Sequence, residues 1–328
     1  MISISVYNID LEKQALLSTF VSLVWEEGYN TEGMFQLECV LDEELIGLFQ
    51  LEWYCGLTGH DTLMVIKSVQ VKDNKIVVNG YPATHIFSDR VSTAVISAEN
   101  AEVAMRGLFS DMEEYPCFEL GTLAGLSDKF ENTYSDGTLL EYYEAIGQAC
   151  DIGFKMYHDK ENKKLLYTVY KGEDDANAKY STMYGNMGDI TYTITSNDYK
   201  NVAIVAGQGT GDERVTVYAG DTEATGSERR EMYVDARNVQ QEDDETDEEY
   251  EERLIEYGEE KLLAQLEEED ITFELAEGEA ELGAMVYCRI PEIGIDLSVR
   301  IAIIQEAYSN NIKSTYLTLG TPVITRRY

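Results

Sequence analysis

The sequence predicts an α+β protein that is mostly β, with two β-barrel-like domains that bracket a small α/β unit and a helix inserted in the second β domain. Three observations support this prediction. Apolar and polar residues alternate through much of 1–92 and of 180–328, which is the period of a half-buried strand. Between these regions, apolar residues recur at helical spacing. An acidic segment at 246–269 begins with a helix-capping pattern and interrupts the second β region.

Residues 1–92 are expected to form the N-terminal β-barrel-like domain. Ile2, Ile4 and Val6 alternate with polar side chains, and the same period returns in later segments. The polar residues 72–75 separate two such segments, which indicates a hairpin. Many strands without long helices are typical of a barrel or a sandwich.

Residues 93–179 are expected to form the α/β domain. The segments 98–109 and 138–149 each carry apolar residues on one helical face. Two apolar strands, at 154–157 and 165–170, follow across a charged turn.

Residues 180–328 are expected to form the second β-barrel-like domain, with an inserted helix at 246–269. Thr246 and Glu249 have the spacing of a capping box, and acidic residues crowd the first turn, where the helix dipole favours them. The helix should pack on its own β domain through an apolar stripe made of Leu254, Ile255, Leu262, Leu263 and Leu266.

The charge of the chain argues against one class of function. The 328 residues include 25 Lys and Arg and 62 Asp and Glu, which gives a net charge of −37. Gripping nucleic acid through its phosphates needs clustered basic side chains, so we do not expect tight DNA binding. Repelling DNA remains compatible with this charge.

Targeting and redox signals are also lacking in the sequence. The first residues have no basic flank and no long apolar core, and no segment approaches the ~18 apolar residues of a membrane helix, so no signal peptide or membrane anchor is expected. The five cysteines are widely spaced without a C-x-x-C motif, which indicates reduced thiols in a chain made in the cytosol.

Catalytic and metal-binding patterns are poorly supplied. The three histidines, His60, His85 and His158, have no partner at zinc-ligand spacing, and no nucleophile motif or calcium loop occurs. We therefore expect no catalytic residue, no cofactor and no metal ion. A pair of carboxylates for glycoside hydrolysis stays open, because any two of the 62 acidic residues could form one.

A glycine-rich segment at 207–211 follows an apolar run. A phosphate-binding loop would need a helix after it. An acidic pair and a strand pattern follow instead, so a tight or bulged β-turn is the favoured interpretation.

Four charged residues, Arg229, Arg230, Glu231 and Asp235, form a candidate subunit interface. Arginine binds carboxylates with two parallel hydrogen bonds, within the chain or on a neighbouring subunit. An ordinary strand with a solvated charged face is the alternative. The 23 tyrosines against 2 tryptophans also suit surfaces that are buried on assembly, although strand propensity alone explains them equally well.

The segment YKNVAIVAGQGTGDERVTVYAG at 199–220, followed by ERREMYVDAR, resembles the hub proteins of tailed-phage tails, the baseplate-hub or tail-associated proteins at the distal end of the tail tube. Further segments fit in the same order: SLVWEEGYNTEGMFQLEC at 22–39, VYKGEDD at 169–175 and GIDLSVRIAIIQEAYSNN at 294–311. The resemblance thus runs through nearly the whole chain. We expect a short form of this family, without a C-terminal lysin region.

The resemblance implies a homotrimer in which each subunit gives two barrel-like domains to a central ring. The six domains would form a collar on the hexameric tail tube, with the α/β unit outside. The implied partners are the tail tube, distal tail proteins and the tape-measure protein, with a central spike or tip protein as a further candidate. The implied location is the distal tail tip of the virion, after synthesis in the host cytoplasm, where DNA passes an acidic channel during ejection.

Two alternatives stay open. The chain could be the hub of a phage-derived contractile bacteriocin or injection system, which the sequence does not distinguish from a virion hub. It could also be a carboxylate-based cell-wall hydrolase, which would need two acids with shifted pKa values in a cleft.

Overall fold

The computed structural model describes residues 2–92, 96–98, 100–112, 115–134, 137–196, 199–242, 245–263, 265, 268–276, 278–310 and 312–320. Strands predominate over helices, which confirms the mostly-β class. The chain divides into two compact units. The main unit consists of Met1–Glu131, Ser135–Tyr192 and Asp270–Thr321, and the inserted unit is built on Thr193–Glu269. The expected division at 92/93 and 179/180 falls inside the main unit and stays a prediction.

The N-terminal part of the main unit is a set of paired antiparallel strands. The expected hairpin at 72–75 is confirmed, because Asp73 and Asn74 take positive φ angles of 51° and 59° in a two-residue turn. The elements are β1 (Ile4–Tyr7), β2 (Lys13–Leu17), β3 (Ser22–Gly28), β4 (Phe35–Val40), α1 (Glu43–Leu48), β5 (Tyr54–Leu57), β6 (Met64–Lys72), β7 (Lys75–Pro82) and the 3-10 helix η1 (Ala83–Asp89).

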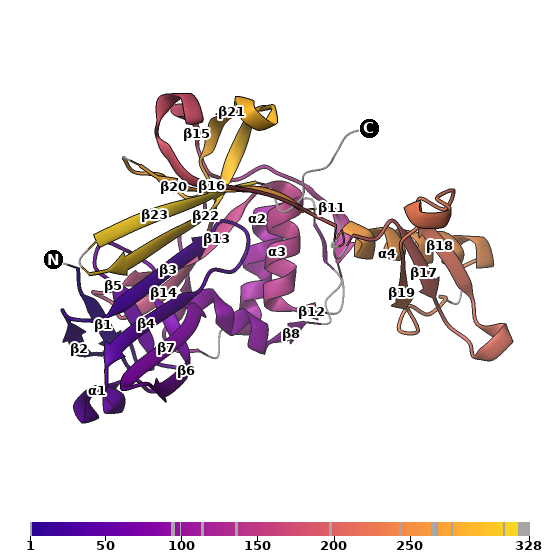
Figure 1. Ribbon diagram of the computed structural model, residues 1–328. Coiled ribbons are helices and arrows are strands. Elements are labelled where there is room, and N and C mark those ends of the chain that lie inside the picture. The colour runs from indigo at the N-terminus through magenta and orange to yellow at the C-terminus, as the bar shows by residue number, and fades with distance from the viewer. Residues whose placement is uncertain are drawn as a thin grey trace. The chain divides into compact units, whose positions relative to one another are not determined.

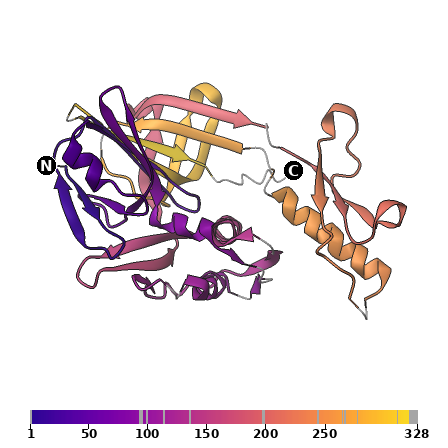
Figure 2. The same cartoon turned by 90° about the horizontal axis from the view of Figure 1, so that it is seen from below.

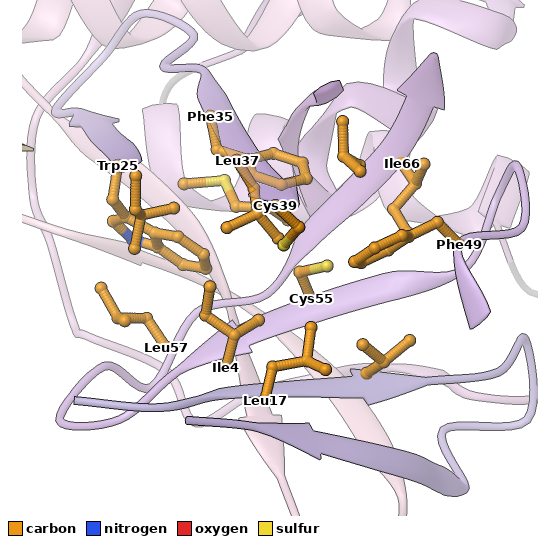
Figure 3. Packing of buried hydrophobic residues seen from close by; sticks show 14 of the residues in the cluster. Ile4, Leu17, Trp25, Phe35, Leu37, Cys39, Phe49, Cys55, Leu57 and Ile66 are labelled. Atoms are coloured by element: carbon orange, nitrogen blue, oxygen red, sulfur yellow. The ribbon is translucent and has the colours of Figure 1, made fainter. Parts of the chain in front are cut away.

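Alternate residues of these strands build one hydrophobic core. Figure 3 shows side chains from β1 to β6 pointing into it, with Trp25 and Phe35 at one end. Both rings are at most 1% exposed. Burying a side chain of this size contributes roughly 1.5–3 kcal/mol to stability, so the period-two pattern of the sequence is what holds this part together.

The C-terminal part of the main unit has its own core, in which Phe273, Val286 and Leu317 are at most 1% exposed. Its elements are β15 (Asp174–Ser181), η3 (Thr182–Tyr184), β16 (Met187–Thr195), β20 (Glu268–Leu275), β21 (Met285–Ile290), η6 (Pro291–Ile293), β22 (Ile295–Ser309) and β23 (Ile312–Leu319).

The strand β22 joins the two parts into one sheet (Figure 1). Its first half pairs with β21, and its second half pairs with β23 on one edge and with β3 on the other. The strand order is β16-β20-β23-β22-β3-β4-β7-β6-β5-β1-β2, with β15 and β21 beside this path. The barrel expectation is corrected here: among the described strands none of the sheets closes, because the edge of β3 pairs with β22 instead of with β2.

The α/β segment packs on η1 through aromatic rings. The rings of Phe87 and Tyr143 are 4.5 Å apart, and Phe109 stacks on Tyr167 at 5.5 Å. Helices α2 and α3 lie side by side (Figure 1). The elements are β8 (Val91–Ser92), β9 (Ile96–Ala98), α2 (Ala101–Leu108), η2 (Phe109–Met112), β10 (Phe118–Leu120), β11 (Phe130–Tyr134), β12 (Gly137–Thr138), α3 (Leu139–Cys150), β13 (Gly153–Asp159) and β14 (Lys164–Tyr170).

The inserted unit is a three-stranded sheet with one helix along it (Figure 2). The central strand β17 pairs antiparallel with β18 and parallel with β19. The inserted part is therefore larger than the single helix that we expected, because these three strands belong to the same unit as the helix. The elements are β17 (Val202–Ala206), η4 (Gly211–Glu213), β18 (Thr216–Gly220), η5 (Gly226–Glu228), β19 (Glu231–Asp235) and α4 (Asp247–Leu263).

Helix α4 begins and packs as predicted but ends earlier. The amide of Glu249 donates to Thr246 Oγ1 (3.3 Å), and the amide of Thr246 donates to the Glu249 carboxylate (2.8 Å), which is the capping box. Leu254 and Leu262 pack against the sheet, and Ile255 is partly buried. The side chains of 263 and 266 lie outside the described residues. None of the helices in the described part of the chain has the length and apolar content that a bilayer crossing requires.

A partly buried charge network joins β22 to β3. His60 contacts Glu27 through Nδ1 (2.8 Å) and Glu306 of β22 through Nε2 (3.2 Å). Burial lowers the pKa of His60, but these two carboxylates outweigh it and raise the pKa to about 9. Burial raises the pKa of Glu306, but hydrogen bonds from His60, Lys313 and Tyr308 outweigh it and lower the pKa to about 2. Charged forms of both groups are therefore part of the folded state.

A second network centres on Arg300, also on β22 and only 4% exposed. Its guanidinium bonds the carboxylate of Asp151 and the carbonyl oxygens of Gly283 and Gly172, and it lies 5.3 Å from the centre of the Tyr29 ring. The hydroxyl of Tyr29 donates to Asp151 O (3.0 Å) and accepts from Gly172 N (3.0 Å). This arginine thereby ties together the N-terminal strands, the end of α3 and the C-terminal strands.

We predict that Gly258→Ala destabilises the inserted unit. A Cβ at Gly258 would lie 2.5 Å from Val205 Cγ2 and 2.8 Å from Ala219 Cβ, so α4 would have to move off the sheet. Overpacking costs ~1–3 kcal/mol, against ~1 kcal/mol gained in helix propensity. Urea unfolding should show a net loss of stability. The matched control is Gly107→Ala in α2, where the Cβ meets nothing within 4 Å. Equal or higher stability of Gly258→Ala would contradict the close contact.

We also predict a loss of stability at alkaline pH that depends on His60. The pKa of His60 rises from 6.5 to about 9 on folding, so its stabilisation is complete below pH 6.5 and is lost as pH rises to 9. The free energy of unfolding should fall by at most about 3 kcal/mol across this window. His60→Gln should be less stable at pH 6 and should show little of this fall. Parallel pH profiles for the variant and the wild type would refute the assignment.

Candidate assembly site

One face of the sheet in the inserted unit is not covered by α4. Side chains alternate along the strands, so Val205, Val217 and Val234 face the helix while the neighbouring residues face away. In the middle of the opposite face, Tyr218, Ile204 and Tyr233 form one row across the three strands. Tyr218 is 52% exposed and Tyr233 is 60% exposed. We call this surface, with the charged side chains beside it, the open face.

At one end of the row, Arg229 is held beside Tyr218. Its Nε donates to Glu231 Oε1 (2.6 Å), and its Nη1 donates to the carbonyl oxygens of Thr222 (3.0 Å) and Ala224 (3.3 Å). The guanidinium carbon lies 5.9 Å from the centre of the Tyr218 ring. These contacts orient the arginine and keep its charge on the open face.

At the other end, Asp235 is shared by two arginines. Arg237 bonds it through Nε and Nη2, and Arg214 bonds it through Nη2 (2.7 Å). These bonds, first those from Arg237, lower the pKa of Asp235 to about 2. Arg214 also donates to the Tyr233 hydroxyl (2.8 Å) and so positions that ring.

Three of the four predicted interface residues therefore lie on the open face. Arg229 and Glu231 pair within the chain, and Asp235 pairs with arginines that the sequence analysis did not name. The side chain of Arg230 instead donates to Ser196 O (3.3 Å) and lies 5.4 Å from the centre of the Tyr199 ring. The role of these residues between subunits stays a prediction.

Of the two arginines that the sequence analysis did not name, only one could have been predicted from the sequence. Arg237 follows Asp235 by two residues, a spacing that could have been noticed. Arg214 lies just before β18 and reaches Asp235 of β19 across β17, and no local pattern indicates that pairing.

The glycine-rich segment 207–211 is a turn, as favoured. It links β17 to η4 and β18, and Gly209 takes a φ of 97° that other residues rarely adopt. A Cβ at Gly207 would lie 2.5 Å from the Tyr250 hydroxyl of α4, so this glycine permits close contact with the helix.

Among the described residues, the carboxyl group of Glu144 comes nearest to an acid–base group. Burial raises the pKa of Glu144 on α3 to about 7, and its Oε1 accepts from the amide of Glu32 (2.9 Å). The Glu32 carboxylate in turn contacts His85 Nδ1 (2.6 Å). Two surface hollows of about 530 and 640 Å³ are lined by other residues. The first lies between residues 119–122 and residues of β13 and β14, and the second lies around Tyr287. The contact of Glu144 ties α3 to the loop after β3.

Two further groups to consider are the potential metal-ligating side chains and the cysteine thiols of the described residues. Within the described ranges, no group of three or more His, Cys, Asp or Glu side chains is arranged to hold a metal ion. The five cysteines are free, and burial raises the pKa of Cys39 and of Cys288 to about 11. Such thiols are poor nucleophiles at neutral pH.

Solved structures share this fold along almost its whole length. The 43 kDa tail protein of prophage MuSo2 from Shewanella oneidensis gives a TM-score of 0.57 at 10% identity, covering 98% of each chain. A tail protein from Neisseria meningitidis MC58 gives 0.56 at 12% identity, covering 97% of this chain and 96% of that chain. Prophage tail protein gp18 from Listeria monocytogenes EGD-e gives 0.52 at 13% identity, covering 97% and 94%.

The sequence itself matches one protein family. A comparison with curated proteins finds no match. Residues 121–321, which are more than half of the chain, match the family described as Siphovirus ReqiPepy6 Gp37-like protein. The chain therefore belongs to the Siphovirus ReqiPepy6 Gp37-like protein family and has the fold of phage tail proteins.

Proposed function

We propose that the protein is a structural component of a phage tail tip, a homotrimeric hub that caps the tail tube and lets DNA pass without catalysis. The observation that carries this proposal is the length of the structural match. The chain and the MuSo2 tail protein each cover 98% of the other, so the likeness to a phage tail protein extends over the whole fold and not over one part of it. Membership of a siphovirus family supports the same role.

The surface of the chain supports assembly. Among the described strands, β2 and β16 each pair on one side only, and an unpaired edge invites further pairing. The row of exposed rings on the open face has the composition of a protein interface rather than of a solvated strand. A closed ring of subunits would bury such surfaces.

The proposed partners follow from this location at the distal tail tip of the virion. They are two further copies of the chain, the tail tube, distal tail proteins and the tape-measure protein, with a central spike or tip protein as a further candidate. A hub of a phage-derived bacteriocin or injection system would use the same fold and the same surfaces.

We predict that the purified protein is a trimer. Light scattering at micromolar concentration should give about 111 kDa, three times the 37.0 kDa of one chain. The same sample should leave a cell-wall suspension turbid. A monomer at every concentration would oppose the hub, and a monomer that clears the suspension would favour the hydrolase alternative, with Glu144 as the first residue to substitute.

We predict that the protein does not bind double-stranded DNA. A net charge of −37 per chain repels phosphates, so DNA would slide through an acidic channel without sticking. A gel-shift experiment at low ionic strength is the sharpest test, because electrostatic attraction is strongest there. Retardation that disappears as salt is added would contradict the proposed channel.

A further inference from the structure

We infer that the open face of the inserted unit binds the solvent face of α4 in a second copy of this chain. The contact is head-to-tail, through arginines on one side and glutamates on the other. The inference rests on the proposed trimer and deepens it, because it names the two surfaces that meet between subunits.

The open face has unused donors beside an apolar centre. A guanidinium carries five N–H donors. In the described part of the chain, Arg229 uses Nε and Nη1, and Arg237 uses Nε and Nη2. Nη2 of Arg229 and Nη1 of Arg237 are therefore left to bind an incoming carboxylate. Tyrosine and arginine around a central apolar row are also the residues that dominate binding energy at interfaces.

The solvent face of α4 supplies the complementary carboxylates. The described exposed residues of the helix are all acidic: Asp247, Glu248, Glu249, Glu251, Glu252, Glu256 and Glu259. Two of these, Glu252 and Glu256, are four positions apart, as are Glu248 and Glu252, and like charges at that spacing repel each other on a helix. The nearby cation Arg253 is already paired with Glu245. Arginines from a neighbouring subunit would relieve this repulsion.

The arrangement of the two faces favours a ring. The helix covers one side of the sheet, so the glutamates and the open face point to opposite sides of the same unit. Three arginines of this acidic chain, Arg214, Arg229 and Arg237, gather on the open face with the carboxylates of Glu231 and Asp235. Two unlike, complementary surfaces make a heterologous contact, which closes into a ring when the rotation allows. A second copy is the fitting occupant, because every subunit brings both surfaces in equal number.

The test reverses each surface in the full-length protein and then reverses both. Arg229→Glu with Arg237→Glu removes the donors, and Glu252→Arg with Glu256→Arg removes the acceptors. Each pair should weaken trimer formation at least about tenfold in light scattering over a dilution series. The chain that carries all four substitutions should recover the trimer, because opposite charges face each other again. Circular dichroism melting of each variant separates lost assembly from lost folding.

Matched controls reverse charges elsewhere. Arg289→Glu alters an exposed arginine on β21 that is paired with Asp296, and Glu44→Arg alters an exposed acid on α1. Both should leave the trimer intact. If folded variants with either surface reversed remain trimers, the inferred contact is wrong while the trimer stands. If the four substitutions together do not restore assembly, the two surfaces do not meet each other. A monomeric wild type would overturn the trimer and this contact together.

Discussion

The main unit depends on one strand that carries two buried charges. Strand β22 pairs with both the N-terminal and the C-terminal strands, and it places Arg300 and Glu306 where those parts meet. A buried charge that loses its partner costs roughly 3–5 kcal/mol. Separating either part from β22 would therefore leave Arg300 or Glu306 without a partner. The hydrophobic cores lie on both sides, and the ion pairs of Arg300 and Glu306 add contacts that link β22 to Asp151 and to His60. This is why the two parts behave as one compact unit.

Local patterns of the sequence predicted many of the helices, strands and turns, but they did not predict which distant strands pair. The capping box at Thr246 and the turn at 72–75 involve residues within a few positions of each other, so spacing alone identifies them. The pairing of Ile303 with Gly28 joins residues far apart in the chain, and it decides that the sheet stays open instead of closing into barrels. The same limit applies to the candidate site. Arg229 and Glu231 are two positions apart, whereas the bond from Arg214 to Asp235 depends on the order of three strands.

The inserted unit shows how one alternating pattern serves two surfaces. Residues on one side of β17 are small and apolar, and Gly258 lets α4 approach them closely. On the other side of the sheet, Ile204 of β17 lies between Tyr218 of β18 and Tyr233 of β19, and Arg229 and Arg214 lie beside these two rings. A unit of this size has a small core, because the surface of a small domain is large relative to its volume. Contacts made by its outer surfaces in an assembly would therefore add to a modest intrinsic stability.

The scarcity of positive charge sets those arginines apart from most of the surface. With 62 acidic and 25 basic residues, most randomly chosen surfaces of two copies would repel each other. Repulsion of wrong contacts is as effective for specificity as attraction in the right one. A cationic, aromatic surface in such a chain can find an attractive partner almost anywhere on an acidic copy, so electrostatics alone would not choose one docking position. The row of Tyr218, Ile204 and Tyr233 supplies what charge does not, because apolar rings gain free energy only where a complementary surface excludes water from them. Electrostatic attraction would bring the cationic face of one subunit toward the acidic helix of another, and the apolar row would determine the docking position.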